Sequence, residues 1–185
     1  GEQVLIEGVC SSAWYRVLRR TFWIWQGADP IELEDVLSHI ATGEGERSYP
    51  DKLDTLKGYA PGNWIYEFSQ LAGDYLKRGR DLEDEGMLDA ARTAYLRAAR
   101  YYSLASYPHL KGDELAEQAQ VQGNLAYRDA GRLMSVPLRE LKIPFRGKEI
   151  CGYLHLPTEE HTVPVVMVSG SIDSLQIDFY RLFEQ

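Results

Sequence analysis

The sequence predicts an α/β protein with a helical amino-terminal domain followed by the start of a β-sheet domain. Up to about residue 135, apolar residues recur every three or four positions, which is the spacing of amphipathic helices. After Pro137 apolar and polar residues alternate, which is the spacing of half-buried strands. We therefore expect a helical domain over residues 1–136 and a second domain over residues 137–185.

Composition limits the class of protein and its partners. The chain has 185 residues, of which 44% are hydrophobic and 26% are charged, as in ordinary soluble globular proteins. Its 20 lysines and arginines against 28 aspartates and glutamates give a net charge of −8, whereas a protein that binds nucleic-acid phosphates is expected to be basic. We expect no nucleic-acid partner.

The cysteines and the hydropathy indicate a cytoplasmic protein. Cys10 and Cys151 lie at opposite ends of the chain, a spacing that suggests neither a disulfide framework nor a zinc site. The first residues lack the features of a secretory signal, and no apolar run is long enough to cross a bilayer. We expect no membrane partner.

The helical domain is expected to contain two single helices, a third long helix and a helix hairpin. The expected ranges are residues 13–26, a helix starting at Pro30, a helix from the Asn63 cap to Lys77–Arg80, and hairpin arms at 83–106 and 114–133. The aspartate before Pro30 supplies an N-cap, and Pro30 itself occupies the first helical position. Facing alanines allow the hairpin axes to approach closely. The hairpin resembles one tetratricopeptide unit, but no second copy follows at a period of about 34 residues, which favours a helical cap.

The second domain is expected to begin with a β-hairpin. Leu141, Ile143 and Phe145 alternate with polar residues, residues 146–148 supply a turn, and the alternation then resumes. Residues 164–168 form an unbroken apolar run, which predicts a buried strand covered on both faces. Residues 175–183 have helical spacing, and the stretch from His155 to His161 is expected to be an exposed loop.

The turn over residues 169–174 is the main candidate for chemistry. A buried strand that delivers small residues to its carboxyl end is where open α/β sheets place ligands, and backbone N–H groups of Gly170, Ser171 and Ile172 suit an oxyanion. The alternative is a connection that uses small residues for backbone freedom alone. Asp173 is either a helix N-cap or an acid at the mouth of a pocket, and the two roles are compatible.

Familiar catalytic and cofactor motifs are missing from the sequence. No serine lies in a G-x-S-x-G nucleophile elbow, no glycine-rich phosphate or dinucleotide loop is complete, and no histidines have metal-ligand spacing. We therefore expect neither a metal nor a cofactor.

Several motifs together resemble one known family. They are Trp14-Tyr15-Arg16, Trp23-Ile24-Trp25-Gln26-Gly27 with Asp29-Pro30, Gly62-Asn63-Trp64-Ile65-Tyr66-Glu67, Tyr107 to Asp113, Ala116 to Gln120, and Pro164 to Val168 followed by Gly170, Asp173 to Gln176 and Asp178. This set is similar to the fermentation-respiration switch protein (FrsA) family, which are esterases of the α/β-hydrolase superfamily. The resemblance covers nearly the whole chain.

The resemblance implies a fold and an activity. It implies a helical amino-terminal domain on an α/β-hydrolase core and a carboxylic-ester substrate. If the protein is such an enzyme, we expect the backbone N–H of Ser171 or Ile172 to contribute to the oxyanion hole and Asp173 to shape or polarise the site. The nucleophile and base of such an enzyme would follow Gln185, so this chain is expected to be incomplete and inactive alone. One departure is Gly170-Ser171, where relatives carry two glycines, because a side chain there narrows the approach of backbone to substrate.

The alternative function is a regulatory interaction with vestigial catalysis. The resemblance also implies binding to the glucose-specific enzyme IIA of the sugar phosphotransferase system. Arg16, Arg19 and Arg20 share one face of the first helix and would form a basic docking surface on an acidic protein. Internal ion pairs of these arginines with Glu32 or Glu34 are the competing interpretation.

Overall fold

The computed structural model describes residues 20–47, 58–107, 113–158, 165–168 and 175–182. Its elements, in chain order, are α2 (Arg20–Trp25), α3 (Pro30–Thr42), α4 (Trp64–Asp84), α5 (Leu88–Ser106), α6 (Glu114–Arg132), β1 (Arg139–Phe145), β2 (Lys148–Leu154) and the 3₁₀ helix η3 (Gln176–Leu182). The described residues before Pro137 that lie in regular structure are almost all helical, and a β-hairpin follows, as the sequence predicts.

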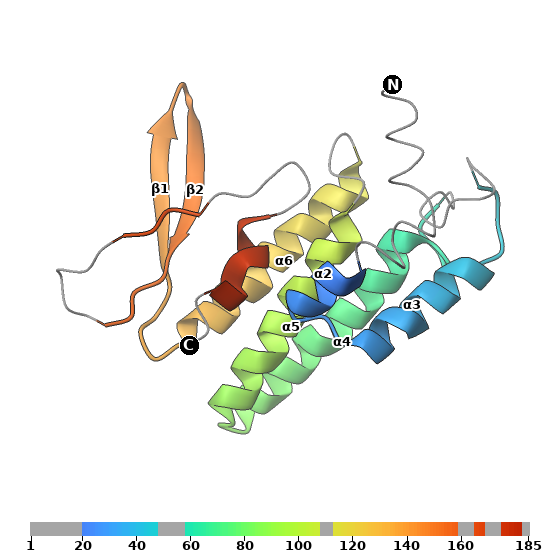
Figure 1. Cartoon of the computed structure of the whole chain (residues 1–185), viewed down its shortest axis with the longest axis horizontal. Coiled ribbons are helices and arrows are strands. Elements are labelled where there is room, and N and C mark those ends of the chain that lie inside the picture. Colours follow the sequence, from blue (N-terminus) through green and yellow to red (C-terminus); the bar gives the residue numbers. More distant parts are fainter. Residues whose placement is uncertain (1–19, 48–57, 108–112, 159–164, 169–174, 183–185) are drawn as a thin grey trace.

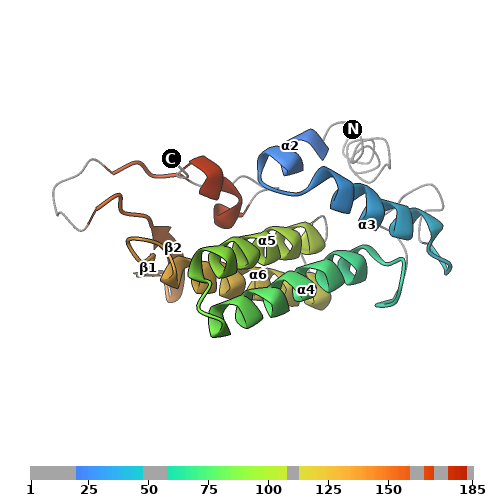
Figure 2. The ribbon, with the colours of Figure 1, turned by 90° about the horizontal axis from the view of Figure 1, so that it is seen from below.

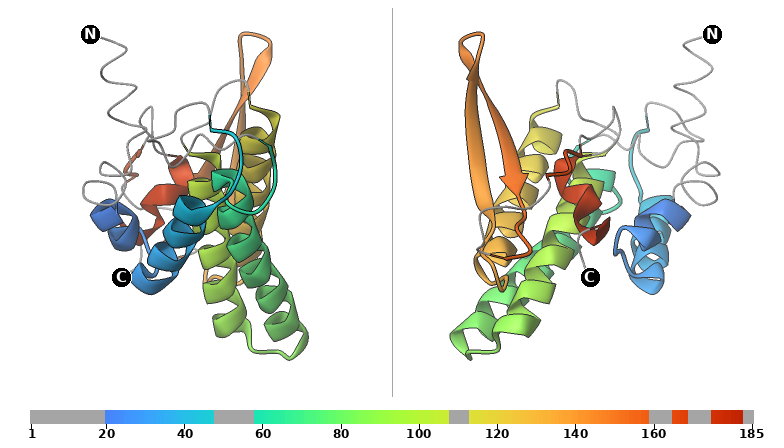
Figure 3. Two further views of the ribbon diagram at one scale, coloured as in Figure 1. Left: turned by 90° about the vertical axis from the view of Figure 1, so that its right-hand side faces the viewer. Right: turned by 60° about the vertical axis from the view of Figure 1, so that its left-hand side comes forward.

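Helices α4, α5 and α6 lie side by side as successive antiparallel arms (Figures 1 and 2). Helices α2 and α3 lie on one side of them and the hairpin lies on the other (Figure 3). Large aromatic side chains fill the space between the helices, and Trp64, Phe68, Tyr95 and Tyr101 are each at most 1% exposed. The core therefore belongs to the helices, since the strands contribute few buried residues.

Three helices begin at the residues that the sequence predicts. The Asp29 side chain accepts a hydrogen bond from the N–H of Ile31 at 2.8 Å, which satisfies a donor that the first turn of α3 leaves unpaired. Asn63 and Asp113 cap α4 and α6 in the same way. These starts depend on neighbouring residues alone, so local sequence determines them.

Helix α4 continues beyond its predicted end at Lys77–Arg80 and reaches Asp84. Gly79 lies inside the helix because α5 packs against it there: a Cβ at this position would lie 2.6 Å from the ring of Tyr95. The glycine is thus a packing residue, and the prediction that it helps to end the helix is wrong. The actual break is at Gly86, which has a φ of +77°.

Small residues also set the distance between α5 and α6. Ala98, Ala105, Ala116 and Ala126 are fully buried, and a Cβ on Gly123 would lie 3.2 Å from the Cβ of Tyr102. Side chains this small let helix axes approach closely. The predicted alanine contact in this helix hairpin is therefore confirmed, although α5 begins at Leu88, five residues later than expected.

The β-hairpin has the predicted strands and turn. Ile143 lies opposite Ile150 in an antiparallel register, and Arg146 and Gly147 have positive φ values of 49° and 74°, the conformation of a tight type I′ turn. One face of the hairpin contacts α6, where Arg128 Nη2 lies 2.5 Å from Glu140 Oε1. The opposite face carries apolar side chains with large exposed fractions: Leu141 42%, Ile143 55%, Phe145 52% and Ile150 51%.

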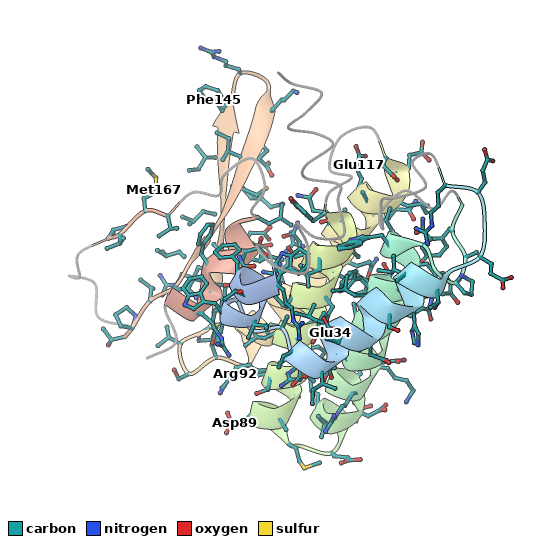
Figure 4. All side chains as sticks on the ribbon, turned by 45° about the vertical axis from the view of Figure 1, so that its right-hand side comes forward. Glu34, Asp89, Arg92, Glu117, Phe145 and Met167 are labelled. Atoms are coloured by element: carbon teal, nitrogen blue, oxygen red, sulfur yellow. The ribbon has the colours of Figure 1, made fainter. Side chains whose placement is uncertain are left out.

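The predicted buried strand over residues 164–168 is not formed by the described residues 165–168. Val165, Val166 and Met167 are 76%, 75% and 91% exposed, and Figure 4 shows Met167 and Phe145 on the outer side, away from the helices. The sheet within the described residues contains only β1 and β2. An apolar run becomes a buried strand only where neighbouring strands and a covering layer are present, and here neither is in place.

The segment that follows is helical but short. Residues 176–182 form η3 with 3₁₀ geometry, in place of the longer helix expected over 175–183. Ile177 and Asp178 are buried, at 6% exposure each. No described helix is long and apolar enough to cross a membrane.

Two glycines of α4 are expected to respond oppositely to replacement by alanine. At Gly73 an added Cβ would meet only the Tyr102 hydroxyl, at 3.8 Å. Because alanine favours helix over glycine, Gly73→Ala should raise the free energy of unfolding by about 0.5–1 kcal/mol. Gly79→Ala, which would clash with Tyr95, should lower it by about 1–3 kcal/mol. Urea denaturation measures both, and changes of the same sign would contradict this packing.

Candidate functional site

The predicted oxyanion turn lies outside the described residues. This applies to Gly170, Ser171, Ile172 and Asp173, whose roles therefore stay predictions. The structure does describe the segment directly after the turn, from Leu175 through η3. A site at the turn would depend on how the helices hold this segment.

A buried carboxylate holds η3 on α5. Asp178 Oδ1 accepts hydrogen bonds from Arg100 Nη1 and from the Ser103 hydroxyl, both at 2.7 Å. Arg100 Nη2 donates in turn to the Ser103 hydroxyl at 3.1 Å. The side chains of Arg100 and Asp178 are only 7% and 5% exposed. Two buried charges are tolerated because each is paired and hydrogen-bonded, and such charge-assisted bonds are short and directional.

The second carboxylate oxygen fixes the end of the turn. Asp178 Oδ2 accepts a hydrogen bond from the backbone N–H of Leu175 at 2.9 Å, and the N–H of Asp178 donates to the carbonyl of Leu175 at 3.0 Å. This is half of a capping box, in which the third residue of a helix binds the N–H of its cap. The first described residue after the turn is thus linked to α5 through one carboxylate. We call Arg100, Ser103, Leu175 and Asp178 the η3 anchor.

Burial affects the arginine of the η3 anchor. Desolvation lowers the pKa of Arg100, and the charge and hydrogen bond of Asp178 oppose that effect. Among the described residues, Arg100 Nε and Gln26 Nε2 have no hydrogen-bond partner, and both residues line a cavity of about 10 Å³. That is room for about one water molecule, so the anchor itself is not a substrate pocket.

A cluster of aromatic rings lies between η3, α6 and the end of β2. The Tyr127 hydroxyl is 2.8 Å from His155 Nε2, and the rings of Tyr127 and Tyr180 each lie 5.9 Å from the imidazole, centroid to centroid. Tyr153 contributes a ring 5.1 Å from that of Tyr127. His155 is partly buried, so the expectation of an exposed loop is wrong at this residue, because Tyr127 and Tyr180 cover it.

Burial keeps this cluster uncharged. Desolvation lowers the pKa of His155 and raises the pKa of Tyr127. The neutral imidazole and the neutral phenol therefore share a hydrogen bond that joins α6 to the chain leaving β2. The η3 anchor and this cluster together hold both segments that flank the predicted strand and turn.

Sequence reasoning missed Arg100 and Ser103 of the η3 anchor and the tyrosines of the aromatic cluster, and it named Leu175, Asp178 and His155 without predicting their contacts. Arg100 follows the buried Ala98 and Ala99 on α5. Its position relative to the buried face of this helix could have indicated a buried charge. Tyr127 lies one residue after a buried alanine and gives no comparable signal, because a tyrosine on such a face is an ordinary core residue.

The predicted basic docking face is described only in part. Arg16 and Arg19 lie outside the described residues, and Arg20 Nη1 lies 2.7 Å from Glu34 Oε1. The internal ion pair is thus confirmed at Arg20. The side chains are 32% and 48% exposed, so this pair adds little stability.

Glu32, the other expected partner of these arginines, is held within the bundle. It accepts hydrogen bonds from the Tyr75 and Tyr101 hydroxyls, and one of its oxygens lies 3.6 Å from Arg97 Nη1. Burial, followed by the hydrogen bond to Glu32, raises the pKa of both tyrosines. The Tyr101 hydroxyl also accepts a hydrogen bond from the N–H of Asp29 at 2.9 Å. This cluster joins the start of α3 to α4 and α5, which is a structural role.

Possible metal ligands are not gathered in the part of the chain that the structure describes. No group of three or more His, Cys, Asp or Glu side chains there could hold a metal ion. Cys151 is an exposed free thiol on β2.

The η3 anchor should show strong coupling between its two charges. Arg100→Met or Asp178→Leu leaves the partner charge buried and unpaired, which should lower the free energy of unfolding by about 3–5 kcal/mol. The double variant should lose much less than the sum of the two single losses. Chemical denaturation of the three variants measures this, with Lys77→Ala at an exposed ion pair as the control. Additive losses would contradict a direct pair.

The aromatic cluster should make stability depend on pH. Because the pKa of His155 is lowered in the folded state, the unfolded chain binds more protons once the pH falls through about 6.5. The free energy of unfolding should therefore decrease from about pH 7.5 to pH 5. His155→Gln keeps a hydrogen-bonding group beside Tyr127 but does not titrate, so its decrease should be smaller. Parallel pH profiles of the two proteins would contradict the burial of a neutral histidine.

Comparison with known proteins supports the sequence resemblance. Residues 3–185 match a family described as esterase FrsA-like. The chain is 45% identical to Esterase FrsA of Photobacterium profundum over 178 residues. This match covers 96% of this chain and 42% of that protein. It is 43% identical over 181 residues to Esterase FrsA of Pectobacterium atrosepticum, covering 97% of this chain and 43% of the relative. The chain thus spans less than half the length of these relatives, and it belongs to the esterase FrsA-like family.

Proposed function

We propose that this chain forms the helical domain and the first strands of a carboxylic-ester hydrolase of the α/β-hydrolase superfamily. Its relatives carry the name esterase, which supports the reaction class. The observation that carries the proposal is the η3 anchor, because it fixes the segment that directly follows the predicted oxyanion turn. Ester hydrolysis needs hydrogen-bond donors that are held in place before the oxyanion forms.

The residues of the turn have distinct proposed roles. Backbone N–H groups among Gly170, Ser171 and Ile172 would bind the oxyanion, and Asp173 would shape the site or polarise it. Leu175 directly follows this turn and is bonded to the buried Asp178. A rigid anchor at this point limits the positions open to the donors, which is the support that a preorganised site requires.

The exposed apolar surfaces support an incomplete hydrolase core. The outer face of the hairpin, together with Val165, Val166 and Met167, presents large hydrophobic side chains to solvent. Contiguous apolar surface of this kind marks a surface that binds further protein. We propose that in a longer protein more sheet covers it and brings the nucleophile and base, so that residues 1–185 alone do not hydrolyse esters.

The regulatory alternative has less support. A basic docking face for enzyme IIA would use Arg16, Arg19 and Arg20, but the Arg20 guanidinium is paired with Glu34. That pair neutralises one of the three charges that would attract an acidic partner. The described residues therefore favour the esterase over a regulatory protein with vestigial catalysis.

Hydrolysis of a nitrophenyl ester tests the proposal. The 185-residue chain should show no turnover above buffer, whereas Esterase FrsA of Photobacterium profundum, the longer relative, should show turnover. In a chimaera that joins residues 1–185 of this chain to the remainder of that relative, Arg100→Met should lower kcat by roughly tenfold or more, because the oxyanion donors lose their anchor.

The matched control is Asp89→Asn in the same chimaera. The Asp89 side chain is 91% exposed and lies at the far end of α5 (Figure 4), so activity should be unchanged. Turnover by purified residues 1–185, or equal kcat in both variants, would contradict the proposal.

A further inference from the structure

A groove of about 400 Å³ lies between α4 and α6, over α5. Ile65, Tyr102 and Ala119 are buried beneath it, and Gln70 and Gln122 are exposed at its edges. None of its described lining residues belongs to the η3 anchor or to the aromatic cluster. Its volume is within the range of small-molecule sites. It is therefore a second candidate site, independent of the proposed esterase chemistry.

The groove contains a glycine, Gly73, which lowers the stability of helix α4. A glycine inside a helix makes the protein less stable than an alanine at the same position would. An interior glycine therefore calls for a packing or functional reason. Gly79, Gly123 and Gly131 have a packing reason, since an added Cβ would lie 2.6–3.2 Å from a neighbouring side chain. Gly73 lines the groove, and its Cβ would meet only the Tyr102 hydroxyl at 3.8 Å. Gly73 therefore leaves space in the groove that a larger side chain would fill.

Tyr102 is the second residue of interest in the groove, because its side chain carries a hydroxyl that can donate or accept a hydrogen bond. Tyr102 is only 9% exposed, and its pKa is raised chiefly by burial. No hydrogen bond joins its side chain to another described residue, and its oxygen is not among the buried side-chain atoms that lack a hydrogen-bond partner. The hydroxyl lies beside Gly73 at the bottom of the groove, where a bound molecule could accept or donate that bond.

The groups along the two edges indicate the class of ligand. Gln70 and Asp74 are four residues apart on α4, and Gln118 and Gln122 are four residues apart on α6. Residues four apart lie on one helix face, so two rows of hydrogen-bonding groups border the groove. Tyr59 adds an aromatic ring at one end, 47% exposed.

The charges of the groove disfavour an ionic ligand. Its described lining contains no lysine, arginine or histidine to attract an anion. Its one carboxylate, that of Asp74, is exposed and therefore screened by solvent, which gives a cation little advantage. Neutral amides, hydroxyls and one aromatic ring remain, and these groups bind uncharged molecules that carry many hydroxyls.

We propose that this groove binds a small uncharged polyhydroxylated molecule of the sugar class. Tyr59 packs against the apolar face of the sugar ring, Gln70, Gln118 and Gln122 bond its hydroxyls, and the Tyr102 hydroxyl makes the deepest contact. Such an open, polar site should bind in the millimolar range.

Titration of the isotopically labelled 185-residue protein, followed by amide NMR shifts, tests this proposal. Maltose, sucrose and methyl glucoside are the neutral ligands, and choline and citrate are the charged comparisons. At least one sugar should cause saturable shifts at residues 69–74 and 118–122. Gly73→Leu should abolish these shifts, and Tyr102→Phe or Gln122→Ala should weaken binding roughly fivefold, as expected for one lost hydrogen bond.

The matched control is Gln120→Ala, which removes the same side chain from α6 outside the described lining of the groove and should leave binding unchanged. Gly73→Ala should combine weaker sugar binding with higher stability, a combination that a structural role for the glycine would not produce. The proposal is overturned if none of the three sugars causes saturable shifts, if choline or citrate binds more tightly than the sugars, or if Gly73→Leu binds normally.

Discussion

A buried positive charge on α5 is the constraint around which the later part of the chain is arranged. The Arg100 side chain is 7% exposed, and a guanidinium at such a site must be paired because an isolated buried charge is very costly. The pairing carboxylate comes from Asp178, 78 residues further along the chain. One ion pair therefore decides where η3 lies, and the turn that precedes η3 is positioned at one end by the same contact.

Small residues let the helices pack closely against one another. Gly79 lets the ring of Tyr95 approach the α4 backbone, and Gly123 lets the Tyr102 Cβ on α5 approach the α6 backbone. Buried alanines do the same between α5 and α6. A well-packed helical layer then offers a rigid base for η3 on one side. The hairpin is different: it touches α6 with one face and leaves the apolar residues of the other face exposed. Among the described residues, the helices therefore bury their apolar side chains against one another, whereas the strands leave theirs exposed.

Features set by neighbouring residues could be predicted from the sequence, and features set by distant partners could not. The caps at Asp29 and Asn63 and the turn of the hairpin depend on local backbone chemistry, so the motifs were sufficient. The continuation of α4 through Gly79 depends on a ring from α5, and the state of residues 165–168 depends on strands that are not beside them. At the candidate site, the family could be predicted and the role of the turn stays a prediction, whereas the Arg100 pair required knowledge of which helix face is buried.

Amide hydrogen exchange in wild type and Arg100→Met is the most direct test of the η3 anchor. If Arg100 holds η3, the hydrogen-bonded amides of Leu175 and Asp178 should exchange at least about tenfold faster in the variant at equal global stability, adjusted with denaturant, because the segment opens locally. Amides in the middle of α6, such as that of Ala126, should be unchanged under the same conditions. Equal exchange of η3 in the two proteins, or faster exchange spread evenly over all helices, would contradict the central claim.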